Sequence, residues 1–127
     1  MRKLLCGLVS SLCMASVLST AAAKTQMEAD PVHYKLEFEN ECVRVSRGTF
    51  GPHEKMPTFF DPQSAVLVFL TDSAGFSLTF PDGRQARTDR TIAGTVIWAD
   101  KPERVRQENA GDSRLEFLVI EPKKGCK

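Results

Sequence analysis

The amino-acid sequence predicts a single all-β domain, built as a barrel or sandwich of antiparallel strands. Apolar and polar residues alternate with a period of two through most of residues 31–122, which is the pattern of strands with one buried face. Turn sequences such as Pro-Asp-Gly and Ala-Gly-Asp separate these segments at short intervals. After residue 23, no segment shows the apolar stripe of an amphipathic helix. Short strands with frequent turns are typical of β-barrels and sandwiches.

Eight strands are expected in chain order. The first two, at 33–38 and 42–50, alternate and are joined by a turn. The strand at 64–70 is apolar without alternation, as expected when both faces of a strand are covered. The strand at 75–80 alternates and leads through a Pro-Asp-Gly turn into a polar return strand at 84–90, which we expect at a sheet edge. The last three strands are expected at 93–99, 105–109 and 114–122.

The alternation also predicts which side chains face the core. Val96 and Trp98 share one face of their strand, and we expect Trp98 in the core because large aromatic residues are mostly buried. The other residues expected on the buried face of a strand are Tyr34, Leu36, Phe38, Val43, Val45, Phe76, Leu78, Phe80, Leu115, Phe117 and Val119.

Residues 1–23 have the pattern of a secretory signal peptide. Arg2 and Lys3 form a basic start, an uncharged apolar run follows, and Ala21 and Ala23 form the small-residue cleavage pattern. The apolar run is shorter than the roughly 20 residues that a membrane-spanning helix needs. We therefore expect cleavage after Ala23, a periplasmic or secreted location, and no membrane association after cleavage.

The predicted mature chain is close to neutral. Loss of residues 1–23 removes two basic residues and no acidic one, so the formal net charge changes from +1 to −1. This gives no electrostatic argument for nucleic acid or anionic membranes as partners. We expect a flexible lead-in over 24–30, one β-barrel domain over 31–122 and a C-terminal tail over 123–127.

Two cysteines, Cys42 and Cys126, remain in the predicted mature chain. Because the chain is expected in an oxidising compartment, we predict a disulfide between them. The alternatives are two free thiols or a bridge between two chains. A metal-binding or catalytic role is not expected, because no histidine stands near either cysteine in the sequence.

The order of the segments resembles the small single-domain cupins. The resemblance is carried by VHYKLEFENECVRVSRGTFGPHEKMP, SAVLVFLTD, FSLTFPDGR, AGTVIW, QEN and LEFLVIE, which together cover residues 31–122. It implies a cupin-type double-stranded β-helix, also called a jelly-roll barrel. Members of this family are often dimers, and many hold a divalent metal in the mouth of the barrel.

The first cupin metal motif is degenerate in this sequence. The motif carries a glycine followed by two histidines just before a proline. Gly51 matches the glycine, but Phe59 and Asp61 stand eight and ten residues later, where the histidines are expected. The usual acidic ligand falls near Ala65 or Val66, and neither side chain can bind a metal.

The second motif keeps its framework and also loses its ligand. Gly94, Trp98 and Asn109 match that framework, and the ligand position falls on Arg104 or Val105, depending on which end the count starts from. A single carboxylate does not hold a transition metal, whose sites use several donors at fixed geometry. We therefore expect neither a metal nor another cofactor in the barrel mouth.

The resemblance points to a different use of the same place. Aromatic walls with a few charged groups are common in small-molecule pockets, and Asp61 and Arg104 could anchor a ligand or pair with each other. Alternatively, Phe59 and Phe60 fill the barrel as core residues. The candidate pocket residues are Phe59, Asp61, Trp98, Arg104 and, near the rim, Met56.

These observations favour an exported, metal-free cupin domain protein with no metal-dependent catalysis, and they leave enzymatic activity of another kind open. It would bind a small-molecule ligand or act as an interaction module, with a homodimer as one such interaction. The alternative is a metal-independent isomerase or epimerase that uses acid–base chemistry in the barrel mouth, with His53 as the candidate base. We favour a structural role for His53, hydrogen-bonded at the end of a strand, and for His33 as well.

Overall fold

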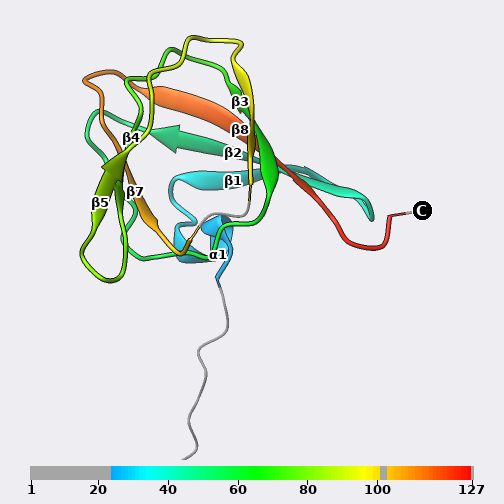
Figure 1. The fold of residues 1–127 in the computed structure, drawn as a ribbon. Coiled ribbons are helices and arrows are strands. Elements are labelled where there is room, and N and C mark those ends of the chain that lie inside the picture. The colour runs from blue at the N-terminus through cyan, green and yellow to red at the C-terminus, as the bar shows by residue number, and fades with distance from the viewer. Residues whose placement is uncertain (1–23, 101–102, 127) are drawn as a thin grey trace, which may run out of the picture.

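The computed structural model describes residues 24–100 and 103–126 of the chain. Within them the all-β prediction is confirmed, because one short helix is accompanied by eight strands, one in each predicted segment (Figure 1). The elements are α1 (Gln26–Ala29), β1 (Tyr34–Glu39), β2 (Val43–Phe50), β3 (Ala65–Phe69), β4 (Phe76–Thr79), β5 (Gln85–Arg87), β6 (Val96–Ala99), β7 (Arg106–Asn109) and β8 (Leu115–Pro122).

The strands form two antiparallel sheets. The larger has the order β1-β2-β8-β3-β6, and the smaller has the order β5-β4-β7. A further segment runs beside β7, where Phe60 N–H donates to the Val105 carbonyl at 3.0 Å and Met56 N–H donates to Gln107 at 2.8 Å. Hydrogen bonds do not close the two sheets into one barrel wall. The core lies between them.

Aromatic rings fill the space between the sheets. Phe117 on β8 lies at the centre of this cluster, with its ring centroid 5.3 Å from that of Phe76 and 6.3 Å from that of Phe50. Gly48 on β2 pairs with Phe117, and a Cβ atom at this glycine would lie 2.5 Å from the ring. Phe60 is 1 % exposed and completes the core. The glycine therefore makes room for the ring that organises the core.

The predicted inward placement of Val43 and Val45 is wrong. In β2 the fully buried positions are Ser46, Gly48 and Phe50, so the two valines lie on the opposite, outer face. The apolar pattern of the strand suggested the other orientation. The inner positions are instead set by the need for a small residue opposite Phe117.

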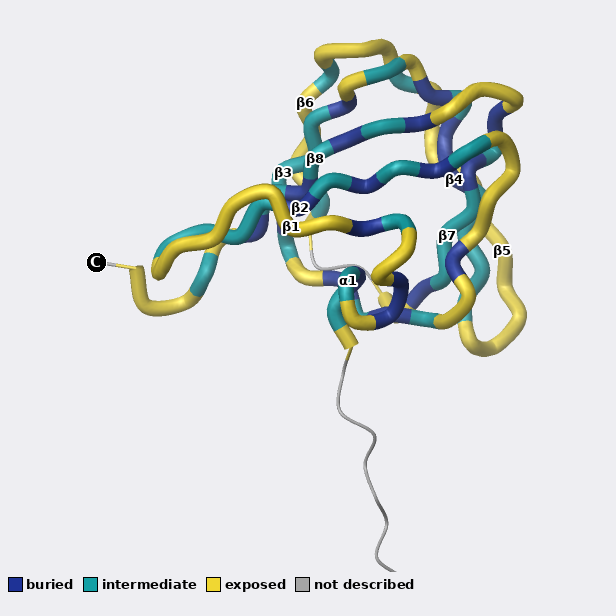
Figure 2. Tube along the Cα trace, turned by 180° about the vertical axis from the view of Figure 1, so that it is seen from behind, coloured by how far each residue is buried: buried dark blue, intermediate teal, exposed yellow. Residues whose placement is uncertain are grey.

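The buried face predicted for β1 is also only partly correct. Tyr34 is buried, but a β-bulge between Leu36 and Phe38 shifts the register, so that Phe38 pairs with Val45 on the outer face. Beyond this point the β1–β2 hairpin and the end of β8 extend away from the second sheet, and the tube there is mostly exposed along β1 and intermediate along β2 (Figure 2). Leu36 and Phe38 therefore have no opposing sheet and are exposed.

The segment 24–30 forms part of the folded domain, which differs from the flexible lead-in that the sequence predicts. Thr25 caps α1, because its side chain accepts from Glu28 N–H while the Glu28 carboxylate accepts from Thr25 N–H. Gln26 and Ala29 are buried. A reciprocal capping box stabilises even a helix of one turn.

Cys42 and Cys126 lie at disulfide distance with their Cα atoms 4.6 Å apart, which is the pairing that the sequence predicts. The pair joins the start of β2 to the tail that follows β8.

Helices able to cross a membrane are absent from the described residues, because none is long and apolar enough. The predicted signal peptide, residues 1–23, lies outside them.

Replacement of both cysteines by serine is expected to destabilise the fold. The bond spans 84 residues, and the chain-entropy model assigns such a loop about 4 kcal/mol of unfolding free energy. Urea denaturation followed by circular dichroism would measure the loss, and the reduced wild-type protein should match the double variant. Equal midpoints for the oxidised and reduced proteins would show that the bond adds no stability.

The two neighbouring phenylalanines are expected to differ sharply on truncation. Phe60→Ala should lower the unfolding free energy by about 3–5 kcal/mol, because a fully buried ring is lost and a cavity remains. Phe59→Ala serves as the matched control, because the Phe59 ring is only half-buried and lies under the Arg106 guanidinium at 5.4 Å. Phe59→Ala should lower the unfolding free energy clearly less than Phe60→Ala in the same urea experiment. A larger effect at Phe59 would contradict this assignment of the core.

Candidate functional site

The interior of the barrel is the first candidate site, since the resemblance places a ligand or metal there. It contains a cavity of about 50 Å³, which is comparable to the space that one or two water molecules occupy. Phe60 takes up much of the interior from the segment beside β7. The residues around the cavity are Gln26, Tyr34, Phe60, Pro62, Gln63, Ala65, Leu67, Phe76, Ala99, Gln107 and Phe117.

Phe59 and Asp61 do not line this cavity. Successive side chains of an extended segment point to opposite sides, and Phe60 is the residue that points inward. Phe59 is half-buried at the surface, under Arg106. Asp61 pairs with Arg104 at 3.6 Å, which is one of the two arrangements expected for these residues. Phe59 and Arg104 also share a shallow surface hollow with residues outside the barrel interior.

Two further pocket candidates lie elsewhere. Met56 was expected near the rim, but it is fully buried in the core. Trp98 was expected in the core or in the pocket, yet it is 56 % exposed on the outer face of β6. The alternation of residues 93–99 predicts the strand correctly, but it does not determine which face is covered. The five predicted pocket residues therefore do not form one site.

The polar groups inside the barrel satisfy each other. The Tyr34 hydroxyl donates to Gln107 Oε1 at 2.9 Å, and burial raises the pKa of Tyr34 above its ordinary value. The phenol therefore stays protonated at neutral pH and cannot serve as a general base. Among residues 24–100 and 103–126, no group of three or more His, Cys, Asp and Glu side chains is placed to hold a metal ion.

His33 connects the N-terminal helix to the barrel. Its Nδ1 lies 2.6 Å from Asp30 Oδ2, its Nε2 lies 3.0 Å from Glu54 Oε2, and its ring stacks on Phe50 at 4.4 Å. The Gly51 N–H and then His33 lower the pKa of Glu54. Both ring nitrogens are occupied within the protein, which supports a structural role for this histidine.

His53 lies outside the barrel interior. Its Nε2 is 2.6 Å from Asp112 Oδ1, and its backbone φ of 56° is the single positive value at a non-glycine residue in the described chain. Histidine tolerates this left-handed conformation better than most residues. Because His53 does not reach the barrel mouth, acid–base chemistry there would lack its candidate base.

A second pocket, of about 450 Å³, lies beside Asp112 at one end of the barrel. It is built by the loops β3–β4, β5–β6 and β7–β8, so the residues that form it are far apart in the sequence. No local sequence motif marks this pocket. The Asn109 framework position was the one available signal, because that residue lies on the wall of this pocket.

The comparisons with known proteins identify the fold. No protein-family model matches the sequence, and no curated protein matches it either. A cupin domain from Bordetella pertussis superposes with a TM-score of 0.61 at 21 % identity, over 71 % of this chain and 91 % of that one. An RmlC-like cupin with a double-stranded β-helix fold from Methanocaldococcus jannaschii gives 0.50 at 18 % identity, over 83 % and 92 %.

A protein of known activity has a similar fold. The polyketide cyclase RemF from Streptomyces resistomycificus superposes with a TM-score of 0.52 at 16 % identity, over 79 % of this chain and 73 % of that one. At such identities the likeness concerns the fold alone. The chain therefore has the fold of the cupins, a double-stranded β-helix, as the sequence predicts.

Proposed function

We propose that this protein is an exported interaction module, which acts as a homodimer through the outer face of its five-stranded sheet. The observation that carries the proposal is a row of apolar side chains that crosses all five strands on the side away from the core. The row consists of Phe38, Val45, Ile120, Val66 and Trp98, each paired with the next across neighbouring strands.

A second row lies beside the first. Leu118, Val68 and Val96 occupy adjacent β8, β3 and β6 on the same outer face. Val96 is 61 % exposed and Phe38 is 53 % exposed. An antiparallel sheet with a free face normally carries polar residues there. A contiguous apolar surface of this kind usually marks an interaction site.

The pattern of β3 supports the same conclusion. The strand is apolar on both faces, as a strand covered on both sides should be. Its inner face lies against the core, where Ala65 and Phe69 are buried. In the described chain, Val66 and Val68 remain partly exposed on the other face. A partner that covers this face would complete the burial that the sequence indicates.

A second copy of the chain fits this surface better than a strongly charged partner. Arg47 at the border of the patch is neutralised by Glu37 and Glu116 of the same chain. Because these border charges are already paired within the chain, they do not favour a partner of opposite charge. Five strands span about 20 Å, so the face can form the centre of an interface of about 800 Å² per partner. A two-fold axis would place the same apolar rows against each other.

Two other observations bear on the proposal. The cysteine pair at disulfide distance fits an oxidising compartment, which supports a periplasmic or secreted location.

The barrel interior offers about 50 Å³, whereas small-molecule pockets commonly have about 300–1,000 Å³. A ligand inside the barrel is therefore disfavoured, and so is acid–base catalysis there, because Tyr34 stays protonated and His53 lies elsewhere.

Trp98→Glu is expected to weaken the dimer by at least about 30-fold in Kd, because a buried aromatic residue at an interface typically contributes about 2 kcal/mol or more. Size-exclusion chromatography with light scattering would measure the mass over a dilution series. Trp98 is the single tryptophan of the chain, so the wild-type emission should also shift to longer wavelength as dilution separates the subunits.

Val32→Glu is the matched control. Val32 is exposed and apolar but lies in the turn before β1, outside the five-stranded face, so its replacement should leave the dimer intact. Circular dichroism would show that both variants are folded. A wild-type protein that remains monomeric at tens of micromolar, with emission unchanged by dilution, would overturn the proposed dimer.

A further inference from the structure

The pocket at the loop end of the barrel is preformed. Ser73 and Thr91 exchange backbone hydrogen bonds of 2.9 and 3.0 Å, which joins the β3–β4 loop to the β5–β6 loop. Asn109 is 1 % exposed, and its amide nitrogen donates to the carbonyls of Gly51 and Ser113 at 2.9 and 2.8 Å. The three loops are thus held in place without a ligand.

Two polar groups of this pocket have no partner within the described chain. Arg90 is exposed and makes neither an ion pair nor a hydrogen bond with the other described residues. The Oγ1 atom of Thr91 is buried and has no hydrogen-bond partner among them. A buried hydroxyl without a partner is costly to the fold, so it requires an explanation. Rotation of the Thr91 side chain toward the pocket would let a ligand supply the missing partner.

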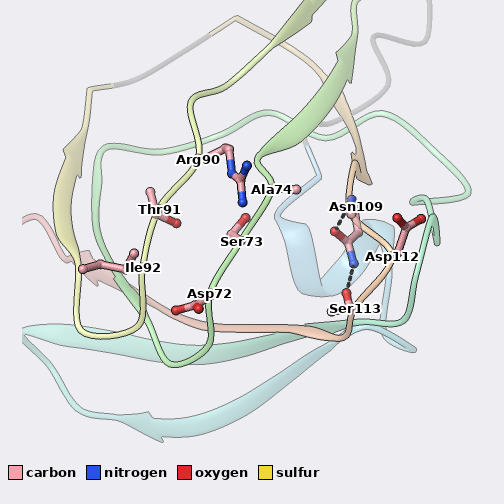
Figure 3. A pocket seen from close by; sticks show the side chains of 10 residues that line it. Asp72, Ser73, Ala74, Arg90, Thr91, Ile92, Asn109, Asp112 and Ser113 are labelled. Carbon is pink, nitrogen blue, oxygen red and sulfur yellow. Dashed lines mark hydrogen bonds between the residues drawn. The ribbon is translucent and has the colours of Figure 1, made fainter.

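Figure 3 shows how these groups lie. The guanidinium of Arg90 and the hydroxyl of Ser73 point toward one another, and the Thr91 hydroxyl lies beside Ser73. Asn109 and Asp112 stand on the opposite side of the pocket. A cationic fork and two hydroxyls on one wall are suited to the oxygens of a carboxylate or a phosphate.

The two acids of the pocket are already engaged. Asp72 accepts from Ala93 N–H at 2.9 Å, and Asp112 lies 2.6 Å from the His53 ring. Their remaining oxygens can accept from hydroxyl groups of a ligand, while their charge disfavours a second anionic group. The pocket therefore suits a small molecule with one oxyanion and additional hydroxyls.

We propose that this loop-end pocket binds a small hydroxylated molecule through its single oxyanion, a carboxylate or a phosphate, with Arg90 as the anion-binding residue. Its volume of about 450 Å³ lies within the range of small-molecule sites. The site is separate from the barrel mouth, because the loop before β3 leads to that mouth and the loop after β3 forms this pocket. It is also separate from the outer sheet face.

NMR titration of the purified, disulfide-bonded protein would test the site. Glycerate and inorganic phosphate represent the two oxyanions, and glycerol is the neutral probe. At least one oxyanion should shift the amide signals of Ser73, Thr91 and Gly111 in a saturable manner, and glycerol should bind at least about tenfold more weakly, because a charged acceptor strengthens each hydrogen bond. The stronger oxyanion identifies the group that the pocket prefers.

Three variants make the test specific. Arg90→Gln should weaken oxyanion binding by about tenfold or more, and Thr91→Val, which keeps the shape of the side chain, should weaken it several-fold. Arg104→Gln is the matched control, because Arg104 is an exposed arginine at the other end of the barrel and should bind the oxyanion as the wild type does. The proposal is overturned if neither oxyanion gives saturable shifts, if glycerol binds equally well, or if Arg90→Gln binds unchanged.

Discussion

The close approach of the Phe117 ring to Gly48 is the constraint on which the rest of the structure depends. A side chain larger than hydrogen at this position of β2 would collide with the ring, so the inner face of β2 is fixed as Ser46, Gly48 and Phe50. Strand geometry then leaves Val45 on the outside, since adjacent residues alternate between faces. The apolar outer surface thus follows directly from how the core is packed.

The strand positions could be predicted because they depend on local signals. Alternation, the Pro-Asp-Gly turn and the apolar run of β3 are visible in the sequence, and each predicted segment contains one strand. The faces could not be predicted equally well, because a face is decided by tertiary contacts. Val45 was assigned inward because it is apolar, but the space opposite Phe117 requires a glycine, and a bulge in β1 turns Phe38 outward.

The candidate site shows the same limit. Counting from Gly51 selected Phe59 and Asp61, yet the residue that enters the barrel is their neighbour Phe60. A difference of one residue reverses the side of an extended segment, and motif spacing alone does not fix it. The loop-end pocket is harder still to predict from the sequence, because Arg90 and Ser73 come from loops that meet only in the folded chain. Asn109 was recognised as framework, and its hydrogen bonds now explain that role.

A filled barrel changes where this fold can act. Polar donors inside a barrel must be paired or hydrated, and here Tyr34 and Gln107 pair while Phe60 occupies much of the remaining volume. The interior then contributes stability and a rigid frame. Among the groups without partners in the described chain are Trp98, which is exposed on the outer sheet face, and Arg90, which is unpaired at the loop end. Recognition by this protein is therefore expected at its surface, and the packed core serves to hold those two surfaces in position.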